Sequence, residues 1–194
     1  AGGTHHAFAD RGEGYCVFND VAVAARVLVD RGALARVAVI DADVHQGNGT
    51  ARIFANDPEV FTCSLHGEKN FPVRKEQSDL DITFPDGARD DEYLPSLARA
   101  IDHVLARHQP DIVFYLAGAD PYEHDRFGRL KLTIDGLHER DRLLFESCRA
   151  AAVPVVVTMA GGYARDIDAI VTIHANTVAE ARRVLAREGV PAWR

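Results

Sequence analysis

The sequence predicts an α/β fold in a single domain, with a parallel sheet flanked by helices. Three observations lead to this prediction. Short runs rich in β-branched residues alternate with longer stretches of helical periodicity, which is the pattern of strand–helix–strand units. The runs are mostly continuous in apolar character, as expected for strands covered on both faces. The chain of 194 residues is 47% hydrophobic and 26% charged, which fits one globular domain over residues 1–194.

The expected core strands are four continuous apolar runs at residues 36–40, 60–65, 112–116 and 154–159. Between the second and third runs, Leu80, Ile82 and Phe84 alternate with polar residues. This two-residue period predicts a short strand with one exposed face. In open α/β sheets, functional sites lie outside the carboxyl ends of the strands, so the residues that follow those ends are the first candidates for functional groups.

Capping residues and helical periodicity predict two helices before the third core strand. Either Asn19 or Asp20 is suited to cap a helix that continues to Leu28 and stops at Gly32. Apolar residues between positions 94 and 105 recur at three- and four-residue spacing, as on the buried face of an amphipathic helix.

Two more helices are expected in the C-terminal part of the chain. One follows Thr133, with apolar residues facing the core. Thr177 and Glu180 have the spacing of a capping box. A helix is therefore expected to begin near Thr177 and to end before Gly189.

The composition excludes several classes of protein. The net charge of −7 argues against sequence-independent binding to nucleic acid. No apolar run approaches the roughly 18 residues of a membrane span, and no secretory signal is visible. Three cysteines at scattered spacings favour neither a disulfide scaffold nor a structural zinc site, and Cys63 and Cys148 fit core positions. We therefore expect a cytoplasmic protein without nucleic-acid or membrane partners.

Ionisable side chains gather where the first core strand ends. If that strand continues, its two-residue period places Asp41, Asp43 and His45 on one face. Unpaired buried charge is costly, and a divalent cation such as Zn²⁺, Fe²⁺ or Mn²⁺ would hold carboxylates and an imidazole together. Asp120 follows the third core strand and is a candidate for a further ligand. The alternative is that these acidic residues cap the following loops, and spacing alone leaves both readings open.

Other polar residues near the strand ends have structural explanations beside functional ones. Tyr163 follows a glycine pair and offers a hydroxyl donor, although a packing tyrosine after a turn is commoner. Ser64 lies near the end of the second core strand, where it suits a monovalent ion or a turn. Taken alone, His5 and His6 are expected to be exposed to solvent, and residues 47–50 are expected to form an ordinary turn.

Several segments of the chain, taken in order, resemble motifs of the histone deacetylase family, which has the arginase/deacetylase fold. They are GGTHHA, GYCVFNDVAVAA, VIDADVHQGNGT, TCSLH, LAGAD followed by DRFG, and MAGGYA. Because these segments cover essentially the whole chain in the family order, the resemblance is specific. The strings HQGNG and VTMAGGYARDIDAIV are most similar to class IV deacetylases and bacterial histone-deacetylase-like proteins.

The resemblance implies a metal centre and a catalytic group around it. The implied ligands of a catalytic Zn²⁺, or of Fe²⁺ in its place, are Asp43, His45 and Asp120. The implied catalytic residues are two tandem histidines, a polar partner for each, and a tyrosine: His5, His6, Asp41, Asn48 and Tyr163. Such a set suits the metal-assisted hydrolysis of an amide.

The resemblance also implies an ion site and a substrate tunnel. The expected contributors to a structural K⁺ site, with backbone carbonyls among its ligands, are Asp41, Ser64 and Leu65. The tunnel is expected to have two aromatic walls with glycines beside the substrate, and the residues concerned are Tyr15, Phe71, Gly14 and Gly162. Apolar walls favour the methylene stem of an acylated lysine.

The chain departs from the family pattern at several positions. Gln46 stands where many relatives have a second histidine, and Asn48 stands where class I members have an acidic residue. An amide carries no charge, so the second catalytic histidine is expected to be less basic. Phe127 replaces the usual Leu or Met and is expected to narrow the tunnel mouth. Because the family has a portion ahead of the histidine pair, the chain is expected to correspond to the C-terminal two-thirds of the domain and to leave a sheet edge uncovered.

The function implied by the resemblance is that of a zinc-dependent deacetylase acting on acyl-lysine side chains of proteins. One alternative is a deacetylase of acetylpolyamines or other small acetylated amines. Another is a fragment that binds acyl-lysine without catalysis. An arginase-like ureohydrolase is disfavoured, because two Mn²⁺ ions need more carboxylates than this site offers. The sequence makes no prediction of oligomeric state.

Overall fold

The structure, a computed structural model, describes residues 2–185. Its centre is one parallel sheet of five strands in the order β3-β2-β1-β4-β5. The strands are β1 (Val37–Asp41), β2 (Val60–Gly67), β3 (Leu80–Phe84), β4 (Ile112–Ala117) and β5 (Val155–Met159). The predicted α/β class and the parallel sheet are confirmed, and each predicted strand is present with its ends shifted by one or two residues.

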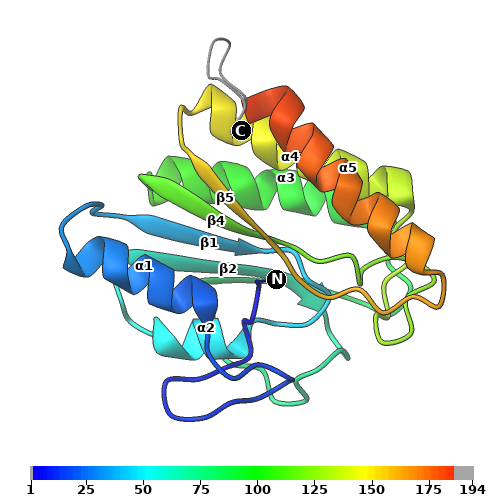
Figure 1. Ribbon diagram of the computed structural model, residues 1–194, viewed down its shortest axis with the longest axis horizontal. Coiled ribbons are helices and arrows are strands. Elements are labelled where there is room, and N and C mark those ends of the chain that lie inside the picture. The colour runs from blue at the N-terminus through cyan, green and yellow to red at the C-terminus, as the bar shows by residue number, and fades with distance from the viewer. Residues whose placement is uncertain (1, 186–194) are drawn as a thin grey trace, which may run out of the picture.

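Helices cover both faces of the sheet (Figure 1). One face carries the short helices α1 (Asp20–Asp30) and α2 (Asn48–Ile53). The other face carries α3 (Asp90–Arg107), α4 (Ile134–Ala150) and α5 (Ile167–Leu185). Within residues 2–185, none of these helices combines the length and the apolar character needed to cross a membrane.

Alternate residues of β1 enter two separate hydrophobic cores. Ala38 and Ile40 pack in the larger core beneath α3, α4 and α5. Val37 and Val39 pack in the smaller core with apolar residues of α1. All four are nearly inaccessible to solvent, so the central strand is apolar from Val37 to Ile40, as its sequence predicted.

One predicted helix cap and one predicted helix start are confirmed. The side chain of Asn19 accepts a hydrogen bond of 3.0 Å from the backbone N–H of Ala22, at the start of α1. Thr133 accepts one of 2.9 Å from Gly136 at the start of α4. The Asn19 side-chain amide also donates to the carbonyl of Ala7 at 3.2 Å. The cap of α1 therefore ties the N-terminal segment to the start of this helix.

One helix prediction and one turn prediction were wrong. Thr177 and Glu180 do not begin a helix, because both lie inside α5. The Thr177 hydroxyl donates instead to Asp141 on the neighbouring helix and to the carbonyl of Ile173 one turn back. Gly189 lies outside the described residues. The segment 47–50 is not a simple turn, because it leads directly into α2.

Strand β5 was expected to be covered on both faces, and this expectation was wrong. It pairs with β4 on one side, and within the described residues no strand pairs with its other side. Val156 is 38% exposed and Met159 is 43% exposed. A continuous apolar run cannot by itself distinguish a central strand from an edge strand. β3, with its alternating pattern, forms the opposite edge.

All five strands run in parallel, so their carboxyl ends meet at one edge of the sheet. The N-terminal segment enters at that edge, beside the loops that follow β1, β4 and β5 (Figure 1). Residues far apart in the sequence thus converge where an α/β sheet places its functional groups.

Candidate active site

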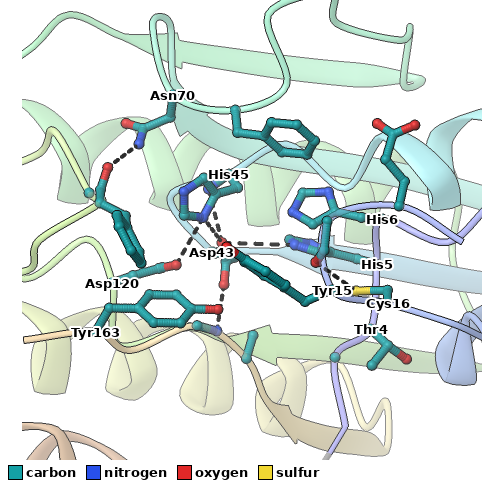
Figure 2. Close-up of a pocket in the computed structure, with 18 of the residues that line it drawn as sticks. Thr4, His5, His6, Tyr15, Cys16, Asp43, His45, Asn70, Asp120 and Tyr163 are labelled. Atoms are coloured by element: carbon teal, nitrogen blue, oxygen red, sulfur yellow. Dashed lines mark hydrogen bonds and ion pairs between the residues drawn. The ribbon is translucent and has the colours of Figure 1, made fainter.

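Three side chains from two loops form a compact cluster at this edge (Figure 2). Asp43 and His45 follow β1, and Asp120 follows β4. The Nδ1 atom of His45 lies 3.0 Å from a carboxylate oxygen of Asp43 and 3.0 Å from one of Asp120. One potential ligand atom from each residue lies within 4.8 Å of the other two, which is the spacing that a single metal ion requires.

The sequence suggested that a continued strand builds the cluster, but the structure shows otherwise. Strand β1 ends at Asp41, and the chain then makes two tight side-chain-to-backbone turns. Asp41 accepts a hydrogen bond from the N–H of Asp43 at 3.1 Å, and Asp43 accepts one from the N–H of His45 at 2.9 Å. Short acidic side chains favour such local turns over an extended ladder.

The donor set fits a divalent cation. Burial lowers the basicity of His45, but its hydrogen bonds to Asp120 and Asp43 raise its pKa to about 10. Burial and the nearby charge of Asp43 raise the pKa of Asp120 to about 7. Two buried carboxylates therefore compete for one imidazole proton, and a divalent ion at the same point would satisfy all three groups.

Gly161 packs against the cluster, and only glycine fits at this position. Its backbone N–H donates to Asp43 at 2.7 Å. A Cβ at this position would lie 1.9 Å from a carboxylate oxygen of Asp120. The glycine pair after β5 thus allows the backbone to approach the ligand carboxylates.

His5 and His6 are buried, so the expectation that they are exposed was wrong. Each ring has its own polar partner. His5 Nδ1 lies 2.6 Å from Asp41 Oδ2, and His6 Nδ1 lies 2.7 Å from Asn48 Oδ1. The two ring centroids are 4.1 Å apart, and both rings lie beside the cluster of Asp43, His45 and Asp120 in Figure 2.

The partners give the two histidines different protonation states. Burial lowers the pKa of His5, but the charges of Asp41 and Asp43 outweigh it and raise that pKa to about 9. For His6, burial and the neighbouring charge of His5 lower the pKa to about 3. At neutral pH, His5 is an imidazolium and His6 is a neutral base.

Glu13, which the sequence analysis missed, fixes the tautomer of His6. Its carboxylate accepts a hydrogen bond of 2.8 Å from the Asn48 side-chain amide. The Asn48 nitrogen therefore points to Glu13, and its oxygen points to His6 Nδ1. His6 must then carry its proton on Nδ1 and present Nε2 as an acceptor. The spacing of 35 residues between Glu13 and Asn48 leaves no local signal for this pair.

Tyr163 extends toward the cluster, with its hydroxyl end directed at Asp43 (Figure 2). Burial raises its pKa to about 12, so the phenol remains a hydrogen-bond donor at neutral pH. Its backbone N–H donates to Asp125 at 2.6 Å, and its ring packs against Phe127 at a centroid distance of 5.0 Å. Asp125 thus holds the tyrosine in place.

The two expected aromatic walls differ in the structure. The ring of Phe71 packs edge-on against His6 at a centroid distance of 4.9 Å. Tyr15 also lines the cavity, but its side chain is 94% exposed and its backbone has a φ of 66°. Gly14 is tightly enclosed, because a Cβ there would lie 2.4 Å from the His6 ring. The wall at Phe71 is therefore packed, whereas Tyr15 stands free at the rim.

These groups line one cavity of about 890 Å³. The sequence-predicted residues that line it are His5, His6, Gly14, Tyr15, Asp43, His45, Phe71, Asp120 and Tyr163. Asp41 and Asn48 lie behind the histidines as their partners. Gly162 is not among the lining residues, and Gly161 takes that place.

The residues expected at a K⁺ site lie apart from this cavity, in the sheet itself. Asp41 on β1 and Ser64 on β2 are neighbours in the strand register, and Leu65 follows Ser64. The Ser64 hydroxyl lies 2.9 Å from Nδ1 of His66, whose side chain is fully buried. Asp41 and Ser64 thus share one face of the sheet, whereas the side chain of Leu65 packs in the larger hydrophobic core on the other face.

The side chain of Gln46 forms hydrogen bonds with the loop that carries Phe71. Its side-chain amide donates to the carbonyl of Glu76 at 2.7 Å and accepts from the N–H of the same residue at 2.9 Å. It also donates to Asp81 on β3 at 3.0 Å. A glutamine next to a metal ligand thus links the cluster to one cavity wall.

The comparisons with known proteins agree with this geometry. A model of the histone deacetylase domain family matches residues 1–179. This chain belongs to the histone deacetylase family. The resemblance seen in the sequence is thereby confirmed at the level of the family.

Similar members of the histone deacetylase family come from distant organisms. An uncharacterised protein of Picosynechococcus sp. strain PCC 7002 is 48% identical over 184 residues, which are 95% of this chain and 61% of that protein. Histone deacetylase 2 of Arabidopsis thaliana is 31% identical over 192 residues, covering 97% of this chain and 48% of that protein. The chain thus spans about half to three-fifths of these relatives.

A solved member of the fold shows the same arrangement of elements. The acetylpolyamine aminohydrolase from Burkholderia pseudomallei superposes with a TM-score of 0.78 at 27% identity. The match covers 93% of this chain and 54% of that one. The deacetylase-like fold predicted from the sequence is therefore confirmed.

Proposed function

We propose that the protein hydrolyses the amide bond of an acylated amine, with acetyl-lysine in a protein as the preferred substrate. The observation that carries this proposal is the convergence of a metal-binding cluster, a neutral histidine and a phenol donor on one cavity. These are the parts that metal-assisted amide hydrolysis needs: an electrophilic ion, a base and an oxyanion donor.

Asp43, His45 and Asp120 would hold a divalent ion, for which Zn²⁺ suits the mixed carboxylate and imidazole donors. Once bound, such an ion supplies Lewis-acid polarisation of the amide carbonyl and of the attacking water. Three protein ligands leave open positions for both, as catalytic zinc sites do.

The protein's own groups then handle protons and charge. His6, with its Nδ1 proton held by Asn48, offers Nε2 to take a proton from the attacking water. The Tyr163 hydroxyl donates to the carbonyl oxygen as that oxygen gains negative charge. The His5 imidazolium, held by Asp41, supports the return of a proton to the departing amine. Phe71 offers an apolar face to the methylene stem of the substrate.

The first test is removal of the base. In the zinc-loaded protein, His6→Ala is expected to lower the turnover of an acetyl-lysine peptide by a factor of about 10² to 10⁴. Metal content, measured by elemental analysis, should stay at one ion per chain, because His6 is not a ligand. His103→Ala, at an exposed histidine on α3, is the matched control and should keep full turnover. Unchanged turnover in His6→Ala would contradict the proposal, and peptide binding without any turnover in the wild-type protein would favour the non-catalytic alternative.

A second candidate substrate is an acetylated polyamine, because the Burkholderia pseudomallei enzyme of similar fold is named for that activity. The charge of the cavity opposes it. Lys69, Arg126 and Arg129 line the cavity, and Arg126 is fixed by a hydrogen bond of 2.7 Å from Nε to the carbonyl of Tyr163. Apart from the metal-binding pair, Glu13 is the one carboxylate among the described lining residues. Lys69 and Arg129 share the carboxylate of Asp86, so Arg126 carries the rim charge that a cationic polyamine would meet.

We therefore expect a higher kcat/KM for an acetyl-lysine peptide with neutral flanking residues than for an acetylated polyamine. The difference should shrink at high salt, because the rim charges are exposed and screened. Arg126→Gln should reduce the difference in kcat/KM between the two substrates. Arg149→Gln, at an exposed arginine near the C-terminal end of α4, should leave that difference unchanged. A higher kcat/KM for the polyamine in the wild-type protein would reverse the assignment of substrate.

A structural K⁺ ion is part of the proposal. Asp41, Ser64 and Leu65 would contribute side-chain and backbone oxygens to it. Such an ion would fix the end of β1 and, through Asp41, the position of His5.

A further inference from the structure

A fully buried arginine lies directly behind the metal-binding cluster. Arg140 belongs to α4 and has no exposed surface. Its Nη1 atom donates to the carbonyl of Gly118 at 2.6 Å and to the carbonyl of Ala42 at 3.4 Å. Ala42 immediately precedes Asp43, and Gly118 lies two residues before Asp120. One guanidinium nitrogen therefore contacts both segments that carry the ligands.

The peptide of Gly118 is wedged between the ligand carboxylates. A Cβ at this position would lie 2.7 Å from an oxygen of Asp43 and 2.9 Å from an oxygen of Asp120. There is no room for this peptide to move toward the ligands. A hydrogen bond to the carbonyl of this peptide, such as the one from Arg140, therefore constrains the distance between the two carboxylates.

A buried counter-ion holds Arg140 in place. Asp141 accepts from Arg140 Nε at 2.9 Å. It also accepts from the Tyr115 hydroxyl at 2.5 Å and from the Thr177 hydroxyl at 2.5 Å. Because Tyr115 belongs to β4 and Thr177 to α5, the network anchors the guanidinium to a strand and to a second helix.

Stability alone does not account for this arrangement. A buried ion pair often contributes no more to folding than apolar residues of similar volume. Moreover, Arg140 Nη2 has no well-aligned hydrogen bond within the described residues, although it lies 2.9 Å from Asp141. An unsatisfied buried donor is destabilising. Apart from its ion pair with Asp141, Arg140 donates to Gly118 and Ala42, and these two bonds lead toward the ligand-bearing segments.

We propose that Arg140 is a positioning residue that holds the two ligand-bearing segments at the separation a metal ion requires. The inference rests on the proposed metal site, and it assigns to α4 a role in metal affinity and ligand geometry. Groups behind the ligands of a metal site commonly change affinity by about 10- to 100-fold when they are removed.

The test measures metal binding, not turnover, on the full chain. The double variant Arg140→Met with Asp141→Asn removes the guanidinium without leaving an unpaired buried charge. The single oxygen of the asparagine can still accept from one of the two hydroxyls, Tyr115 or Thr177, and its amide nitrogen can donate to the other. We expect Zn²⁺ to bind at least ~10-fold more weakly in chelator competition. The d–d absorption spectrum of the Co²⁺-loaded variant should also shift, which a merely structural role would not cause.

Two further variants separate positioning from folding. Arg140→Lys keeps the charge but offers one compact donor in place of the planar fork, so an intermediate loss of affinity is expected. Phe145→Leu alters another fully buried residue of α4, and it should lower stability without changing the Zn²⁺ dissociation constant or the Co²⁺ spectrum. If the double variant does not fold, Arg140→Lys carries the test.

The outcomes distinguish this proposal from the proposed function. Wild-type affinity and an unchanged Co²⁺ spectrum in the folded Arg140 variants would overturn the role of Arg140 and leave the metal site intact. Equal losses in Phe145→Leu and in the Arg140 variants would also overturn it, because the effect would then reflect general destabilisation. If the wild-type chain binds no divalent metal, the metal site itself is refuted.

Discussion

Two adjacent histidines differ in protonation state because each has a different hydrogen-bond partner. His5 faces a carboxylate, and its pKa is raised to about 9. His6 faces the neutral amide of Asn48, and its pKa is lowered to about 3. The rings are similarly enclosed, so the difference comes from the charge of the partner and from mutual repulsion. An acid and a base can therefore stand side by side.

Replacement of Asn48 by aspartate should make His6 more basic. The new carboxylate would stabilise the imidazolium, so Asn48→Asp is expected to raise the pKa of His6 by one unit or more, or roughly 1.4 kcal/mol. The pKa is measured by NMR titration of the ring in the zinc-loaded protein. If His6 is the base, the acid limb of the pH–kcat/KM profile should move to higher pH by the same amount.

The control for this prediction is Glu13. Its carboxylate, which now accepts from the Asn48 amide, would face a second carboxylate in the variant. Glu13→Gln in the Asn48→Asp background should relieve that repulsion and preserve the raised pKa of His6. An unchanged His6 pKa in both variants would show that burial, not its partner, fixes the charge state.

At the scale of elements, the sequence predicted what depends on local chemistry and failed where tertiary contacts decide. The cap at Asn19 and the start of α4 after Thr133 depend on local chemistry, and both were predicted. Thr177 has the same side-chain chemistry as a cap, but Asp141 on α4 offers its hydroxyl a buried acceptor, so the helix continues through it. Similarly, the apolar pattern of β5 gave no sign that it is an edge strand.

The candidate site divides in the same way. The candidate metal ligands and both histidines could be named from the sequence, because family motifs carry them in contiguous strings. Glu13, Gln46 and Arg140 were missed as contributors, because each acts through partners that are distant in the sequence. Only the folded sheet brings Arg140 to within hydrogen-bond distance of Gly118 and Ala42.

A buried histidine on β2 should make folding stability depend on pH. Burial lowers the pKa of His66 to about 4, from an ordinary 6.5, although Asp81 partly opposes this. The folded state therefore favours the neutral ring. The resulting stability is complete above pH 6.5 and is lost as the pH falls from 6.5 toward 4. The loss is expected to reach about 3 kcal/mol, since one pKa unit corresponds to roughly 1.4 kcal/mol.

The measurement compares the wild-type protein with His66→Asn by urea unfolding at several pH values. Asparagine can keep a hydrogen bond to Ser64, which lies 2.9 Å from His66 Nδ1, but it does not titrate. The stability of the wild-type protein relative to the variant should decrease between pH 7 and pH 4. A difference that is constant with pH would contradict the expected role of His66.

At the scale of the whole molecule, the candidate site is assembled at the expense of stability. The fold brings Asp43 and Asp120 from different loops into a buried cluster, where burial and mutual repulsion raise the pKa of Asp120 to about 7. Above that pH, both carboxylates are ionised in the folded chain. The metal-free protein therefore carries an electrostatic cost that a bound divalent ion would remove, and this predicts strong coupling between metal binding and folding.

Thermal unfolding at pH 8 tests this coupling. A free Zn²⁺ concentration a thousand times the dissociation constant should stabilise the fold by about 4 kcal/mol, because the ion binds only the folded state. For a domain of this size, that is a rise of roughly 10 °C in Tm. Asp120→Asn should abolish the rise, since it removes a ligand. Without metal, however, the variant should be no less stable than the wild-type protein, because it removes one of two neighbouring buried charges while its remaining oxygen can accept from Val44. Destabilisation of the metal-free variant, together with an intact response to Zn²⁺, would show that Asp120 supports the fold instead of binding the ion.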